Sequence, residues 1–243
     1  MKNLIKKYLN LEKNDRTMLL LINITIINIV IAIVKFIFAI TLPSLWFFIN
    51  AIFMSILSIS RFFSIRNYGK QRSTKLTKEQ KEQIGYKNYL HNGILLILLG
   101  IIYFFVSVYM YQKGTNTTMH EYLTYLVALN AFWSISWAIY GMIKYNKKTS
   151  PILKSVKMTN FANALTSMVL TQVVLLDTYA KEYDLTQVNG YTGMGVSLII
   201  IVIGLYMIIN IKEELINKWA RDRTIIFKVA ICDLKQKHQS KRI

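Results

Sequence analysis

A row of uncharged polar side chains runs along an apolar stretch in the second half of the chain. Asn160, Asn163, Ser167 and Thr171 follow one another at steps of three or four residues, so a helix would place them on one face. Amide and hydroxyl groups can hydrogen-bond a small solute or a neighbouring helix. The row therefore predicts either a solvated cavity or a crowded helix interface, and the sequence does not decide between them.

Groups suited to catalysis or cofactor binding are scarce. The sequence has no His and Cys residues at metal-binding spacing, no nucleotide-binding loop and no Ser, His and Asp set of the kind found in hydrolases. The three histidines, His91, His120 and His238, are scattered, and the single cysteine, Cys232, excludes an internal disulfide. We expect no enzymatic activity, no bound metal and no cofactor.

The elements that carry these residues are six long apolar blocks, in a chain that is 53% hydrophobic. A helix needs about 20 apolar residues to cross a lipid core about 30 Å thick, and open strands cannot cross lipid. The sequence predicts an all-α integral membrane bundle of six helices, with a transmembrane domain over residues 18–211. The expected spans are about 18–40, 44–64, 90–111, 122–143, 158–176 and 192–211.

Polar connections are expected between these spans. The sequence predicts a basic loop from Asn67 to about Tyr89. It also predicts a short basic loop from Lys144 to Lys157, interrupted by Ser150-Pro151. A polar loop containing Asn189-Gly190 precedes span six.

Lysine and arginine give the chain a net charge of +18, and most of them lie between the apolar blocks. This separation favours a membrane protein over a nucleic-acid-binding protein. Of the 30 Lys and Arg residues, 26 lie in the N-terminal segment, the loops after spans two and four, and the C-terminal tail. Because basic loops stay on the cytoplasmic side, we predict a multi-pass protein of the cell membrane with both termini in the cytoplasm.

Two basic segments flank the spans. Residues 1–17 are predicted to be either a helix on the membrane surface or a solvated leader, and residues 212–243 form a basic cytoplasmic tail. We expect the tail to contact anionic lipid, each basic side chain adding about 1 kcal/mol. Its basic residues include Lys212, Lys218, Arg221, Arg223 and Lys228.

Charged residues are almost absent from the spans. No Asp or Glu lies in the middle of any span, where a charge is costly and usually marks function. Lys35 lies near the outer end of span one. We expect its long side chain to reach the interface as an anchor, in preference to a functional role.

Several short motifs occur in one order along the chain. They are Asn28, Lys35 and Ser44 around the first turn, Asn67-Tyr-Gly-Lys70, Ser150-Pro151, Ala164-Leu-Thr-Ser167, Gly193, and Ile211-Lys-Glu-Glu-Leu215. In this order the chain resembles, from about residue 28 to 215, the membrane domain of the cation diffusion facilitator (cation efflux) family. The resemblance implies a six-helix fold, a homodimer, and a divalent-metal site between spans two and five. The tail is too short for the family's cytoplasmic metal-binding domain.

The resemblance also locates the metal positions in this chain, and they lack metal ligands. Alignment through Ser44 gives Phe53 and Leu57 in span two, and alignment through the span-five motif gives Thr159 and Asn163. Zinc needs imidazole, carboxylate or thiolate ligands. Phenylalanine and leucine supply none, and the neutral oxygens of threonine and asparagine are poor substitutes. We therefore predict a degenerate site that does not export zinc by the family's usual route.

Two classes of function remain. The first is a diverged transporter that moves a monovalent cation or a small polar solute, with Asn50, Thr159, Asn163 and Ser167 as candidates for the transport pathway. The second is a non-transporting membrane scaffold or regulatory partner, in which Phe53 and Leu57 pack the old pore shut. A dry gap between spans two and five favours the scaffold, whereas a cavity that reaches Asn163 favours transport.

Overall fold

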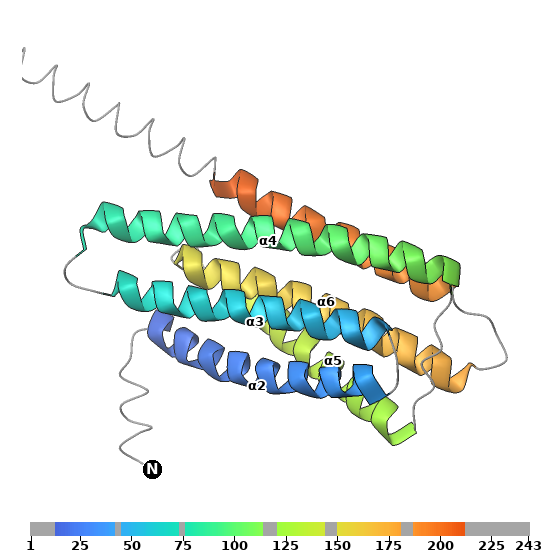
Figure 1. Ribbon diagram of the computed structural model, residues 1–243. Coiled ribbons are helices and arrows are strands. Elements are labelled where there is room, and N and C mark those ends of the chain that lie inside the picture. Colours follow the sequence, from blue (N-terminus) through green and yellow to red (C-terminus); the bar gives the residue numbers. More distant parts are fainter. Residues whose placement is uncertain are drawn as a thin grey trace, which may run out of the picture.

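The computed structural model describes residues 13–41, 45–72, 76–113, 121–143, 150–180 and 187–211, and nearly all of these residues are α-helical (Figure 1). No residue in these ranges belongs to a β-strand, so the prediction of an all-α fold is confirmed for them. The helices are α2 (Lys13–Thr41), α3 (Leu45–Gln71), α4 (Lys78–Lys113), α5 (Glu121–Ile143), α6 (Pro151–Tyr179) and a further helix, Gln187–Ile211.

All six helices are long and apolar enough to cross a membrane. Their outward faces carry large apolar side chains, such as Leu126, Leu129 and Phe132 on α5, which are more than half exposed. Apolar surface of this extent needs a bilayer to cover it. The prediction of a multi-pass membrane protein with six spans is thus confirmed.

Helix α6 lies in the middle of the bundle and packs against α2, α3, α4 and α5 (Figure 1). Helices α2 and α3 form an antiparallel hairpin, held near its turn by ring contacts between Phe36 and Phe48 (centroids 5.6 Å apart) and between Phe38 and Phe47 (5.9 Å). Helix α5 packs along α6, and α4 runs beside the helix Gln187–Ile211 (Figure 1).

The helices extend beyond the apolar blocks at the end of the bundle that holds Lys70 and Lys78, here called the basic end. Because α3 continues to Gln71 and α4 begins at Lys78, the prediction of a loop from Asn67 to Tyr89 is wrong. Helical backbone hydrogen bonds do not require apolar side chains, so hydropathy marks where lipid contact ends and not where a helix ends.

Two other predicted loops contain helix starts. Ser150 caps α6, since its side chain accepts a hydrogen bond from the Leu153 amide (3.4 Å) and Pro151 takes the first helical position. The sixth helix begins at Gln187 and includes Asn189-Gly190. The predictions for residues 1–12, the turn at 42–44 and the tail at 212–243 lie outside the described residues.

A network of amides and hydroxyls joins α3, α4 and α6 in the half nearer the basic end. The Asn88 side-chain amide donates to Ser64 (3.0 Å) and Ser155 (3.1 Å), and the Asn92 amide donates to the same two hydroxyls (3.2 and 3.0 Å). Ser60 in turn donates to the Asn92 oxygen. Each buried amide therefore has partners on two other helices, which fixes α4 against the bundle.

The helix Gln187–Ile211 approaches α4 closely at Gly204. A Cβ atom at this position would lie 2.8 Å from the Gly93 carbonyl oxygen and 2.7 Å from Ile97 Cγ1. Gly195 on the same helix has nothing within 4 Å of such an atom. Small residues allow membrane helices to pack backbone to backbone, so Gly204 is required for this contact and Gly195 is not.

We predict that Asn92→Leu destabilises the protein by about 1–3 kcal/mol, because it leaves the buried Ser60 hydroxyl without its acceptor and removes the bonds from α4 to Ser64 and Ser155 that Asn92 makes. Thermal unfolding of purified protein in detergent measures the loss. Leu98→Ala, on the lipid-facing side of α4, serves as the control. Equal unfolding temperatures for Asn92→Leu and the control would contradict the role of the network.

We also predict that Gly204→Ala lowers the unfolding free energy by about 1–3 kcal/mol through overpacking. Gly195→Ala makes the same chemical change in open space. It should leave stability unchanged or raise it by up to about 1 kcal/mol through helix propensity. The two variants are compared in one unfolding experiment, and a loss of equal size in both would rule out the close contact as the cause.

Candidate functional site

The space between α3 and α6, where the resemblance implies a metal, is filled by apolar side chains. Phe53 and Leu57 are buried in the main hydrophobic core. The Phe53 ring packs edge-on against Tyr103, with centroids 6.0 Å apart. Both α3 positions are therefore closed by packing, and this region of the core is called the packed gap here.

Three of the four candidates for the transport pathway lie outside any cavity lining that the structure describes. Thr159 donates to the Val156 carbonyl of its own helix (2.9 Å), and Asn50 donates to the Trp46 carbonyl (3.1 Å). Ser167 is buried and accepts a hydrogen bond from a lysine of α2. Only the fourth candidate, Asn163, lines a cavity.

This cavity lies between α2, α5 and α6, beside the packed gap and not within it. Its volume is about 50 Å³. A buried water needs roughly 10–15 Å³ measured in this way, so the cavity has room for a few waters or one small solute. It is called the amide cavity here because its polar lining is Asn28, Asn130, Ser134, Asn160 and Asn163, with Ile24, Ile27, Ile31, Trp133, Trp137 and Ala138 completing the wall.

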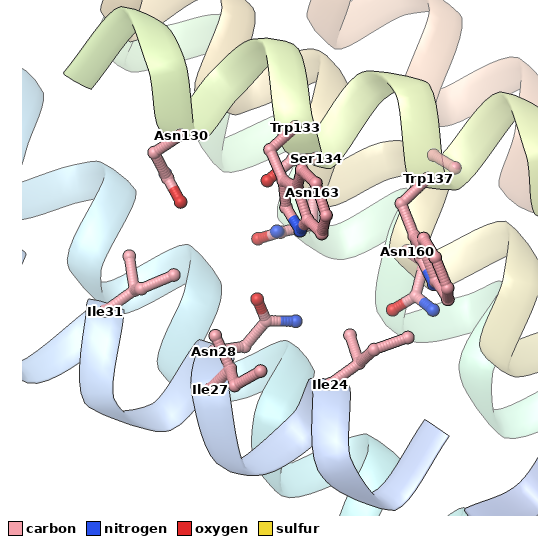
Figure 2. Close-up of a pocket in the computed structure, with 11 residues that line it drawn as sticks. Ile24, Ile27, Asn28, Ile31, Asn130, Trp133, Ser134, Trp137, Asn160 and Asn163 are labelled. Carbon is pink, nitrogen blue, oxygen red and sulfur yellow. The ribbon is translucent and has the colours of Figure 1, made fainter. Parts of the chain in front are cut away.

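The amides come from three helices and converge (Figure 2). The side chains of Asn28 on α2 and Asn163 on α6 point toward one another, and Asn130 on α5 points into the same space. A primary amide offers two N–H donors and one oxygen acceptor, and its end group turns about a soft torsion. The cavity can therefore present donors or acceptors to a polar ligand.

Two of these amides have unmet hydrogen-bonding capacity. The Oδ1 atoms of Asn160 and Asn163 are buried and have no hydrogen-bond partner among the described residues. Leaving such an oxygen unpaired costs about 1–3 kcal/mol. This free-energy cost is removed if the amide group rotates by half a turn and its oxygen accepts a hydrogen bond from a water or a ligand in the cavity. The site is therefore suited to hold a polar occupant.

The cavity is open toward the lipid between α2 and α5. These two helices both contribute to its wall but scarcely touch each other. Ile27 and Trp133 stand at the rim, exposed to 54% and 70% respectively, and the Trp133 ring stacks near Trp137 with centroids 6.3 Å apart. Access from the bilayer side is therefore less obstructed than access through the packed core.

The prediction that Lys35 is an interfacial anchor is wrong. Its side chain is only 5% exposed, and its ammonium donates to the Ser167 hydroxyl across the α2–α6 contact (3.4 Å). Distance from the end of a span says nothing about which face a residue occupies. Lys35 falls on the inward face, because it lies seven residues after Asn28 and four after Ile31, which both line the cavity.

Arg61 on α3 is a buried charge that the sequence analysis missed. It is 1% exposed, and none of its three guanidinium nitrogens has a hydrogen-bond partner among the described residues. Its position near the end of an apolar block made it look like part of the basic loop. Arg61 follows Leu57 by four residues, so the two share one face of the helix. This spacing is the sequence signal that could have indicated that Arg61 is buried.

The polar row on α6 divides between the two expected roles. Asn160 and Asn163 line the cavity. Beyond them, Ser167 meets Lys35, and Thr171 bonds to the Ser167 carbonyl (3.0 Å) and to the Val127 carbonyl of α5 (3.4 Å). The half of the row nearer the basic end is thus a cavity wall, and the other half is a helix interface.

No family model and no curated protein sequence matches this chain. The resemblance to the cation efflux family therefore stays a prediction. Within the described ranges, no three His, Cys, Asp or Glu side chains lie close enough to hold a metal ion.

We predict that Asn163→Leu leaves thermal stability unchanged or raises it, in contrast to Asn92→Leu. The substitution replaces a buried amide whose oxygen has no partner among the described residues by an apolar group of similar size, which removes a desolvation penalty. Unfolding temperatures of the two variants and the wild type provide the test. A loss for Asn163→Leu as large as that for Asn92→Leu would mean that Asn163 has a structural partner.

Proposed function

We propose that this protein is a membrane carrier that binds a small polar solute in the amide cavity, on a six-helix frame of cation-efflux type. The observation that carries the proposal is the cavity itself: four asparagine side chains from three membrane-spanning helices converge there, and two of their oxygens lack partners. Polar groups that serve only to join helices find partners on those helices, as Asn88 and Asn92 do.

The side chains present argue against divalent metal as the solute. Of the four positions that the resemblance assigns to metal binding, Phe53 and Leu57 are packed into the core, and Thr159 bonds to its own helix. Asn163 alone faces open space. A Zn²⁺ ion needs several anionic or imidazole ligands, and the amide cavity supplies only neutral amides and one hydroxyl.

Size and chemistry limit the solute. The cavity volume of about 50 Å³ has room for a few waters. A solute that replaces them can have roughly three or four non-hydrogen atoms. The amides can donate to it and accept from it, while Trp133 and Trp137 cover its apolar side. Of the two solute classes expected from the sequence, a polar solute is favoured over a monovalent cation, because the ammonium of Lys35 lies about one helical turn beyond the site.

The placement of the protein follows from its charges. We propose that it lies in the cell membrane with both termini in the cytoplasm, its basic tail on anionic lipid, because 26 of its 30 Lys and Arg residues lie in segments that would then share that side. A homodimer is part of the proposal through the resemblance alone.

A non-transporting scaffold is the second candidate, and the burial of Phe53 and Leu57 in the hydrophobic core favours it. A carrier must expose its site to each side of the membrane in turn. A scaffold needs no such motion, and its cavity would hold only water.

Flux into proteoliposomes separates the two. The probes are formamide, formate, formamidinium and rubidium, with protein-free vesicles as the baseline. We expect at least one probe to enter faster through the wild type, and Asn163→Leu to reduce that rate about tenfold, the equivalent of one buried hydrogen bond. Asn23→Leu makes the same change on the exposed side of α2 and should have no effect. If no probe exceeds the baseline while the protein remains folded, the scaffold is the better account.

A further inference from the structure

The ammonium of Lys35 lies about one helical turn beyond the amide cavity, on the side away from the basic end. Lys35 follows the cavity residues Asn28 and Ile31 on the same face of α2, and its partner Ser167 follows Asn163 by one turn of α6. One helical turn rises about 5–6 Å. A solute in the cavity would therefore lie about one helical turn from the charged group.

No counter-charge in the described residues neutralises this ammonium. Its hydrogen bond to Ser167, at 3.4 Å, goes to a neutral hydroxyl. The acidic side chains that the structure describes, Glu79, Glu82, Glu121 and Asp177, lie toward the ends of their helices. An ammonium has three donors, so at least two of those of Lys35 are without a described acceptor.

Arg61 adds a second uncompensated cation to the described part of the bundle. It is 1% exposed, and its three nitrogens have no partner among the described residues. A buried charge is normally paired, because removing a lone ion from water costs several kcal/mol. With two such cations and no described carboxylate in the middle of a span, the interior of the bundle has a positive potential.

We propose that the amide cavity takes a small monovalent anion of the carboxylate type, with Lys35 as its charge partner. This inference rests on the proposed function, and it specifies the solute's charge. The nearby ammonium would attract the anion through its charge, while the N–H groups of Asn28, Asn130 and Asn163 would donate to its oxygens. The volume limits it to about the size of formate or acetate.

Three planar molecules of equal size isolate the effect of charge. Formate is an anion, formamide is neutral and formamidinium is a cation, and each has three non-hydrogen atoms. Binding is measured by titrating the tryptophan emission of the full chain in detergent, since Trp133 and Trp137 line the cavity. We expect formate to bind at least about tenfold more tightly than formamide, and formamidinium to bind most weakly, because the adjacent ammonium attracts the first and repels the last.

Substitutions at Lys35 test the assigned partner. Lys35→Met, which keeps the length of the side chain and removes its charge, should weaken formate binding at least about tenfold and leave formamide binding within about twofold. Lys35→Arg should retain the preference for formate. Ser167→Ala removes the hydroxyl and keeps the charge, so it should keep the preference as well.

The outcomes separate this inference from the proposed function. Saturable formate binding that depends on Lys35, in a protein that moves no probe across vesicle membranes, would support the anion site and contradict the proposal of a carrier. Flux of formamide or formamidinium that depends on Asn163, without a preference for formate in the wild type, would support the carrier and contradict the inference of an anion site. The wild-type order of affinities decides the question even if Lys35→Met fails to fold.

Discussion

In the core of a lipid bilayer no water is available to a polar side chain, so each such group must find its partner within the protein. Many hydroxyls in this bundle meet that demand locally. Thr25 donates to the Leu21 carbonyl (2.7 Å) and Ser55 donates to the Ala51 carbonyl (2.8 Å), each one turn back on its own helix. The longer amide side chains can also bond to other helices, as those of Asn88 and Asn92 do. Where the partner lies on another helix, the same bond that satisfies the group also sets the position of that helix.

This demand gives α6 two different sides. Toward α3 its contact is apolar and closed, with Phe53 and Leu57 in the core. Toward α5 it is held by polar bonds in the half away from the basic end, where Thr178 pairs with Thr124 (3.0 Å). Nearer the basic end such bonds are replaced by the amide cavity, where Asn160 and Asn163 keep unpaired oxygens. The polar volume of the bundle thus lies one helix interface away from the place where the resemblance puts a metal.

The sequence predicted the features that depend on single helices. Hydropathy found six spans, because the thickness of the bilayer fixes the length of each apolar block. Spacing found Asn163, because helical periodicity fixes which residues share a face. It could not show that Asn28 and Asn130 meet Asn163, since that depends on how α2 and α5 dock on α6.

The same limit applies to Lys35 and Arg61: a sequence position gives depth in the membrane, whereas the packing of neighbouring helices decides whether a side chain faces lipid or the protein interior. Helix ends outside the lipid, such as Gln71 and Lys78, were missed because hydropathy carries no signal there.

Charge outweighs hydrogen-bond geometry in setting what the amide cavity can hold. An amide accepts or donates by turning its end group, so the asparagines alone discriminate little between an anion, a neutral molecule and a cation. A unit charge about 6–8 Å from an ammonium gains or loses about 2–3 kcal/mol at an effective dielectric constant of 20. The difference between an anion and a cation of one shape is then about 4–6 kcal/mol, a factor of more than 1,000 in affinity. No rearrangement of four neutral amides supplies a preference of that size in the opposite direction. The buried position of Lys35, set by the same packing that turns Asn28 inward, is therefore the property of this fold that most separates it from a site for metal cations.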